Sequence, residues 1–167
     1  CHGDSASDLE LVPRVVASNN TRLDLDPSNP SYHPVIAAGR AFDVPSIPSA
    51  LAPTLSPSDQ VYCTSCHADD DGDSDGPHGS DYPPILRERY EIADGTPESY
   101  ENFALCYRCH ERSSILADAS FRPKALPTTP SGGGHSGHLA AGVACASCHD
   151  PHGIQADLGG PESGDHT

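Results

Sequence analysis

Strongly apolar residues are sparse along this chain: Leu, Ile, Val and Phe make up 28 of its 167 residues. Polar residues, 17 Pro and 15 Gly separate them throughout. Proline and glycine favour turns and extended segments over regular elements. The pattern therefore predicts a single domain over residues 1–167 that is mostly coil, with a few short α-helices and little or no β structure.

Local signals predict three features within this coil. Thr96 suits a helix N-cap and is followed by a proline and a glutamate, so we expect a helix over about 97–112. Residues 44–58 contain four prolines and predict an extended, polyproline-like connector. The three glycines at 132–134 predict a flexible hinge or a place where the backbone passes closely over a ring.

The composition is that of a chain that cannot build its own core. Acidic residues number 24 against nine Lys and Arg, the formal charge is −15, and the strongly apolar types form only about 17%. Order must therefore come from another source. The few, scattered basic residues argue against nucleic acid as a partner, and no apolar stretch is long enough to predict a transmembrane segment.

The sequence Cys-x-x-Cys-His occurs three times, at residues 63–67, 106–110 and 145–149. This spacing is the attachment signature of c-type haem. Two thiols bond the vinyl groups on one porphyrin edge, while the adjacent imidazole reaches the iron from one face. The thiols are Cys63 and Cys66, Cys106 and Cys109, and Cys145 and Cys148; the imidazoles are His67, His110 and His149.

Two other roles for these cysteines fit less well. Zinc sites use paired ligand knuckles, and a disulfide framework needs no His after every second Cys. Haem also supplies the apolar surface that the chain lacks, as a metal or disulfide does in a small scaffold. We therefore expect one extended domain organised around covalently bound, stacked haems.

The pair Cys1-His2 has two interpretations. It is either the end of a fourth haem motif, with His2 on the iron, or the start of a lipoprotein in which Cys1 carries lipid. The sequence favours the haem, which makes four haems, or three if this pair binds none. A chain that starts at this Cys and contains no Met is expected to be processed or truncated.

The second axial ligand of each haem should be histidine. His or Met usually fills this position, and the chain has no Met. Bis-imidazole ligation lowers the reduction potential relative to His/Met ligation, so we expect a low-potential electron carrier. The candidate distal ligands are His33, His78, His135, His138, His152 and His166, of which His135 and His166 are the weaker candidates.

The reach of the chain restricts one of these pairings. His152 follows His149 by three residues, which span only about 10 Å when extended. That is too short to pass around a porphyrin edge, so His152 should ligate a different haem and bring two haems together. His78 and His138 lie far enough from the motifs to serve their own haem or a neighbour.

Several phrases of the sequence resemble doubled-motif, multi-haem c-type cytochromes. They are the run 145–153, which ends in Asp-Pro-His-Gly, the His-Ser-Gly-His phrase before it, Gly-Pro-His-Gly at 76–79, and Tyr-His-Pro-Val at 32–35. The resemblance implies that His152 and His33 are distal ligands. It also implies electron transfer, either in a subunit of an extracellular filament (nanowire) or in a soluble periplasmic or cell-surface shuttle.

We expect a head-to-tail homopolymer outside the cell, because the coil-rich chain has few haems and spare histidines near its opposite ends, His33 and His166, that could bridge to a neighbouring subunit. Its partners would be other redox proteins or extracellular electron acceptors, and the alternative compartment is the periplasm. A multi-haem reductase is less favoured, because distal candidates outnumber irons and leave none open, so no catalytic residue is expected.

The acidic run at 71–76 matches the first half of a calcium loop, with candidate ligands Asp71, Asp73 and Asp75. Tyr82 stands where the bidentate acid of such a loop belongs, so a solvated acidic loop is the simpler interpretation and calcium the alternative.

Overall fold

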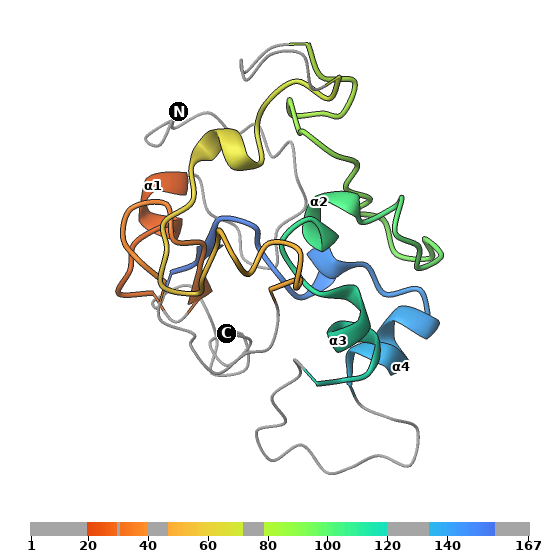
Figure 1. Ribbon diagram of the computed structural model, residues 1–167. Coiled ribbons are helices and arrows are strands. Elements are labelled where there is room, and N and C mark those ends of the chain that lie inside the picture. The colour runs from red at the N-terminus through yellow and green to blue at the C-terminus, as the bar shows by residue number, and fades with distance from the viewer. Residues whose placement is uncertain (1–19, 30, 40–46, 72–78, 120–133, 156–167) are drawn as a thin grey trace.

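Short helices and turns connected by coil make up the computed structural model (Figure 1), which describes residues 20–29, 31–39, 47–71, 79–119 and 134–155. In chain order the elements are α1 (Thr21–Asp24), β1 (Ser31–Tyr32), η1 (Cys63–Ser65), α2 (Ala104–Tyr107), α3 (Arg112–Leu116), α4 (His135–Ala140), η2 (Cys145–Ser147) and β2 (Gly153–Ile154). The predicted mostly coil fold with short helices and little β structure is confirmed.

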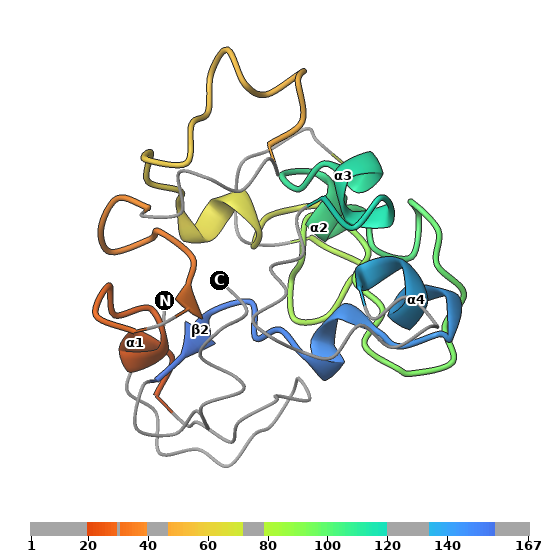
Figure 2. The ribbon, with the colours of Figure 1, turned by 90° about the horizontal axis from the view of Figure 1, so that it is seen from below.

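The two strands join distant parts of the chain. They pair antiparallel, with Ser31 opposite Ile154 and Tyr32 opposite Gly153. Figure 2 shows β2 beside α1. On the other side of the molecule α3 packs beside α4, near α2 (Figures 1 and 2). The termini of the described chain are thus joined by a very small sheet.

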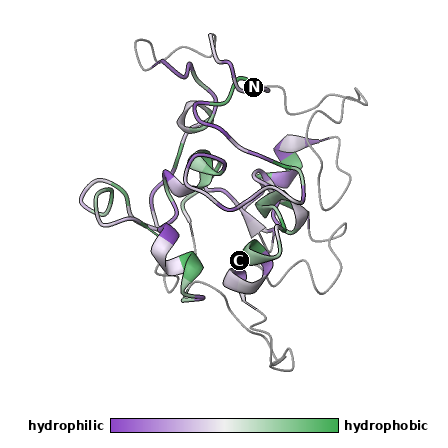
Figure 3. Cartoon of the chain, turned by 90° about the vertical axis from the view of Figure 1, so that its right-hand side faces the viewer, coloured by the Kyte–Doolittle hydropathy of each residue, from purple (hydrophilic) through white to green (hydrophobic). Residues whose placement is uncertain are grey.

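The hydrophobic core is small. Phe103 and Tyr107 are buried with Ala144, and Tyr90, Ile115 and Cys145 pack against them. Half of the other buried apolar side chains are alanines, and Figure 3 shows hydrophobic residues as short, separated stretches. The three aromatic rings of this core, Tyr90, Phe103 and Tyr107, lie around the second Cys-x-x-Cys-His motif.

The helix expected over 97–112 is wrong. The structure has only α2 and α3 there, and no helix over 97–103. Thr96 does not cap a helix, because its hydroxyl donates to the carbonyl of Ala93 at 2.7 Å. Asn102 closes a loop instead, since its side-chain amide donates to the Pro97 carbonyl at 2.9 Å and its backbone N–H to the Ser99 hydroxyl at 3.1 Å. Local polar bonds of this kind compete with helix formation.

The extended connector expected over 44–58 is also wrong in its described part, residues 47–58. Pro48 accepts hydrogen bonds from the N–H groups of Leu51 and Ala52, and Leu51 accepts them from Thr54 and Leu55. This part of the chain is therefore folded into successive tight turns. Pro57 has the second position of the turn from Ser56 to Asp59, for which its fixed φ is suited. Of the glycines at 132–134, only Gly134 lies in the described part, where a Cβ would collide with the Asp118 carboxylate. The close approach is to a carboxylate, and the predicted pass over a ring stays a prediction.

No helix in the described ranges is long and apolar enough to cross a membrane.

Candidate cofactor site

The three Cys-x-x-Cys-His motifs share one backbone conformation. In each, the carbonyl of the first Cys accepts hydrogen bonds from the N–H of the second Cys, at 3.1–3.2 Å, and from the N–H of the His, at 2.8–2.9 Å. This single helical turn appears as η1, as the end of α2 and as η2. It gathers two sulfur atoms and one imidazole within five residues, the donor set that covalent haem attachment requires.

Each motif histidine lies beside one histidine from elsewhere in the chain. The ring centres are 6.1 Å apart for His67 and His152, 6.1 Å for His110 and His33, and 6.0 Å for His149 and His135. The angles between the ring planes differ widely, at 8°, 63° and 36° in the same order. The constant quantity is therefore the separation and not the packing angle.

A shared metal ion accounts for this separation. With a metal–nitrogen bond of about 2.0 Å, as for zinc, and a nitrogen about 1.1 Å from the ring centre, two imidazoles on opposite sides of one metal have centres roughly 6 Å apart. Each ring can turn about its own metal–nitrogen bond without changing that distance. Direct ring packing would instead tie the distance to the angle. The residues present thus fit a haem iron between each pair.

His110 has the protonation state that a metal ligand needs. Burial, followed by the neighbouring His33, His149 and His135, lowers the pKa of His110 to about 4. The imidazole is therefore neutral at neutral pH, and a neutral imidazole has a free lone pair for a metal.

The histidine pairs are held by different parts of the fold. His33 follows β1 and His152 precedes β2, so the small sheet holds both. His135 begins α4, where the Asp118 carboxylate accepts hydrogen bonds from the N–H and hydroxyl of Ser136 at 2.8 and 2.7 Å. His67 is oriented by the carbonyl of Pro84, 3.2 Å from its Nδ1. Such outer contacts fix the ring orientation of metal-binding histidines.

The other candidate residues are not brought into these pairs. His138 is exposed and has no aromatic ring partner in the described part of the chain. Cys1, His2, His78, His166, Asp73 and Asp75 lie outside the described residues, and Asp71 lies at the edge of that region. Within the described ranges no group of three or more His, Cys, Asp or Glu side chains could hold a metal ion by itself.

The second and third motifs meet through their first cysteines. A hydrogen bond joins the thiols of Cys106 and Cys145; it is the main cause that raises the pKa of Cys106 and lowers that of Cys145. Burial raises the pKa of Cys109 and Cys148. Reactive cysteines have a lowered pKa, whereas three of these four thiols, Cys106, Cys109 and Cys148, have a raised one.

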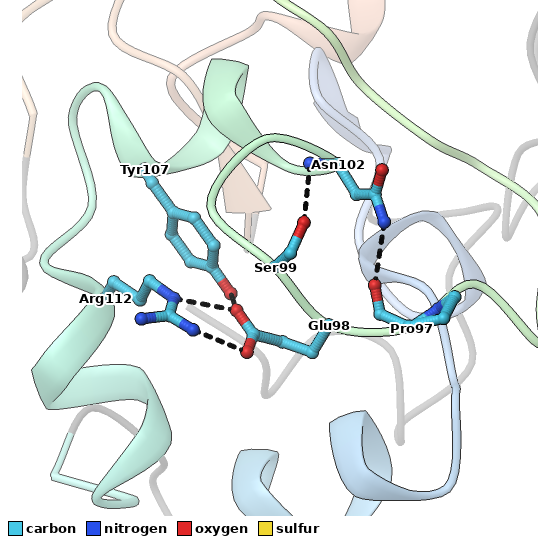
Figure 4. A network of polar contacts seen from close by, with 6 residues as sticks. All are labelled: Pro97, Glu98, Ser99, Asn102, Tyr107 and Arg112. Atoms are coloured by element: carbon cyan, nitrogen blue, oxygen red, sulfur yellow. Dashed lines mark hydrogen bonds and ion pairs between the residues drawn. The ribbon is translucent and has the colours of Figure 1, made fainter.

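A polar network fastens the second motif to the loop before it (Figure 4). The Glu98 carboxylate accepts hydrogen bonds from Arg112 at 2.7 and 2.8 Å and from the Tyr107 hydroxyl at 2.9 Å. Tyr107 lies between the two cysteines of the motif. The Arg112 contacts are the main cause that lowers the pKa of Glu98, so the carboxylate stays ionised and paired in mildly acidic solution.

Replacing Glu98 with Gln is expected to lower the free energy of unfolding by about 1 kcal/mol, or the melting temperature by roughly 2–4 °C. The estimate is small because the Arg112 side chain is 40% exposed. Because the pKa of Glu98 is lowered in the folded state, its stabilisation is present above the ordinary glutamate pKa and is lost as the pH falls through the lowered value. Thermal unfolding measured from neutral to acidic pH should therefore show the difference from the native protein disappear.

The matched control is Glu88→Gln. Glu88 pairs with Arg108 at 3.3 Å, and both side chains are 40% exposed, so little change is expected. Equal losses in the two variants, or a difference that persists in acid, would show that Glu98 does not act through this ion pair.

Two features of the site went unseen in the sequence. The sequence favours His138 over His135 as a distal ligand, but it is His135 that lies beside a motif histidine. The carbonyls of Pro84 and Pro151, which contact ring nitrogens of His67 and His33, carry no sequence signal. The Ser after His135, which Asp118 holds, is the only local sign that could have favoured it.

Comparison with known proteins supports this chemistry. The model of a family described as a doubled CXXCH motif matches residues 56–114, a range that includes the first two motifs. The match supports the class of multi-haem c-type cytochromes. No curated protein and no solved structure matches the chain.

Proposed function

We propose that this protein transfers electrons through at least three bis-histidine c-type haems. Haem 1 would be held by Cys63 and Cys66, haem 2 by Cys106 and Cys109, and haem 3 by Cys145 and Cys148. The axial pairs would be His67 with His152, His110 with His33, and His149 with His135. Bound haem supplies one-electron chemistry at iron; the chain supplies attachment, ligation and spacing.

One observation carries this proposal. Three motif histidines each lie 6.0–6.1 Å, centre to centre, from one other histidine, at three different ring angles. A chance arrangement gives no reason for a one-to-one pairing. With both axial positions filled, none of these irons has an open site for a substrate, which favours an electron carrier over an enzyme.

The arrangement of the ligands also favours close haems. His152 follows the motif of haem 3 by three residues and lies beside the histidine of haem 1. The thiols of Cys106 and Cys145 are hydrogen-bonded, so the attachment edges of haems 2 and 3 would be adjacent. Each haem would therefore have a neighbour through which an electron can leave.

As a finer form of the proposal, the protein is a subunit of an extracellular cytochrome filament. The supporting observation is His138, an exposed imidazole on α4 that the three pairs do not use. Because the three proposed irons each have two histidines already, His138 would serve a fourth haem, held by Cys1 and His2 of an adjacent subunit. Contacts that repeat head to tail without closing produce filaments. His33, a bridging candidate on sequence grounds, lies beside His110 of its own chain. The alternative is a soluble periplasmic or cell-surface shuttle.

Native material tests both levels of the proposal. Intact mass is expected to show three or four covalent haems, and the reduced protein should bind no carbon monoxide, because that ligand needs an open ferrous site. Fewer than three haems, or carbon monoxide binding at every iron, would refute the electron carrier. Electron microscopy at moderate salt should show filaments; uniform single particles with the same closed irons would favour the shuttle.

A further inference from the structure

We infer that the sheet of β1 and β2 is a positioning device that sets one axial ligand of haem 1 and one of haem 2 together, with Gly153 as the residue that allows it to close. The inference rests on the proposed function, since it concerns ligands of these haems. It adds a coupling between two haem sites that their separate motifs do not imply.

The register of the sheet places the two ligands side by side. Tyr32 is opposite Gly153, so His33, the next residue after β1, and His152, the residue before β2, face each other at the same end of the ladder. His33 lies beside His110, whereas His152 lies beside His67. One short sheet therefore carries a ligand from each of two axial pairs.

Only glycine fits at position 153. Its φ is +127°, a conformation that other residues rarely adopt. A Cβ there would lie 2.6 Å from the Ser31 carbonyl oxygen and 2.8 Å from the Tyr32 Cα, and it would also overlap the carbonyl oxygen of Asp24. All three obstacles belong to the segment that leads into His33. A side chain at 153 would push the two strands apart.

A buried polar cluster beside the sheet joins the segment before β1 to the residue after β2. Asp24 and Asn29 are 1% and 5% exposed. The Asn29 amide donates to the carbonyls of Leu23 and Asp24 at 2.6 and 2.8 Å, and the Gln155 amide donates to the Asp24 carboxylate at 2.7 Å. Gln155 follows β2, so this bond fastens the second strand to the segment before the first. Satisfied buried polar networks of this type make a local structure rigid.

Further contacts orient the His33 ring and fix the backbone at His152. Nδ1 of His33 contacts the carbonyl oxygen of Pro151, the residue before His152. With Nδ1 donating there, Nε2 keeps the lone pair that a metal needs. The Asp150 carboxylate accepts from the N–H of His152 at 3.0 Å, and the Asp150 carbonyl from Gly153 at 3.1 Å. A shift of β2 would thus disturb both ligands at once.

The ring angles give each haem its own spectroscopic signature. Nearly parallel imidazole planes, as at 8° for His67 and His152, split the two iron dπ orbitals and give a rhombic low-spin signal in electron paramagnetic resonance (EPR). Strongly crossed planes, as at 63° for His110 and His33, leave those orbitals nearly degenerate and give a highly anisotropic signal. Haems 1 and 2 can therefore be followed separately.

The decisive variant is Gly153→Ala in the haem-loaded protein. Both of these EPR signals are expected to be lost together, and the reduced protein should bind two equivalents of carbon monoxide where the native protein binds none. His33→Ala and His152→Ala should each open one site. Gly95→Ala is the control: Gly95 has a φ of +88° but has nothing within 4 Å of an added Cβ, so no site should open.

The outcomes separate this inference from the proposed function. If the native irons are already open, the proposed ligation is wrong. If the native irons are closed and Gly153→Ala opens none, one or all three described sites, the sheet does not couple haems 1 and 2. If Gly153→Ala yields no haem-loaded protein, Gln155→Ala is the second test. The EPR signals of haems 1 and 2 should then shift together, while that of haem 3 stays unchanged. A shift of only one of the first two signals would overturn the inference.

Discussion

Replacing His135 with Ala is expected to open the iron of haem 3, whereas the same change at His138 should leave it closed. The two histidines are three residues apart in α4, but only His135 lies 6.0 Å from the motif histidine His149. Loss of one axial ligand should convert a low-spin iron to high spin. It should also raise the reduction potential of haem 3, since axial ligands set haem potentials over a range of roughly 0.8 V.

Carbon monoxide binding to the reduced variants gives the number of irons with an open coordination site. One equivalent is expected for His135→Ala and none at haem 3 for His138→Ala, and a redox titration should show a single shifted component for the first variant. Because the two substitutions remove the same group from the same short helix, they have similar effects on helix stability. An open haem 3 in His138→Ala, with His135→Ala unchanged, would reverse the assignment.

The chain without haem is expected to be unfolded. The only buried cluster of large side chains is built on Phe103 and Tyr107 within the described residues, and a core of that size does not offset the conformational entropy of the chain. Haem bound only in the folded state supplies the missing free energy. A variant with the six motif cysteines replaced by Ala should therefore lack a cooperative thermal transition by circular dichroism.

The control for this experiment is Phe103→Ala in the haem-loaded protein. Removing a buried Phe costs about 3–5 kcal/mol, yet that protein should still melt cooperatively if the haems provide most of the order. Cooperative melting of the cysteine-free chain, lost on Phe103→Ala in the same background, would show that the polypeptide folds by its own core.

The covalent half of the site could be predicted from the sequence because its chemistry is local. Five consecutive residues hold two thiols and one imidazole, and the composition with few apolar residues already indicated a coil-rich fold. The prediction of a helix over 97–112 was wrong because the side chains of Asn102 and Glu98 form hydrogen bonds that close a loop there. Propensity is a weak guide where side chains can close loops.

The pairing of the histidines could not be predicted, because it depends on contacts between distant segments. The contact from His33 to Pro151 spans 118 residues, most of them coil. No periodic pattern links such positions, so reach alone could exclude His149 as the partner of His152 but could not select His67. The choice between His135 and His138 depends on how α4 is set by Asp118, which the sequence does not reveal.

The sheet that joins residues 31–32 to 153–154 has a consequence for the order of biosynthesis. A chain is made from its N-terminus, so the thiols of haem 1 emerge well before His152, and His33 emerges before the strand that holds it. Neither of these two sites can be completed until almost the whole described chain is present. A chain that ends before residue 152 would therefore lack both the histidine paired with His67 at the proposed first haem and the strand that holds His33 at the proposed second haem.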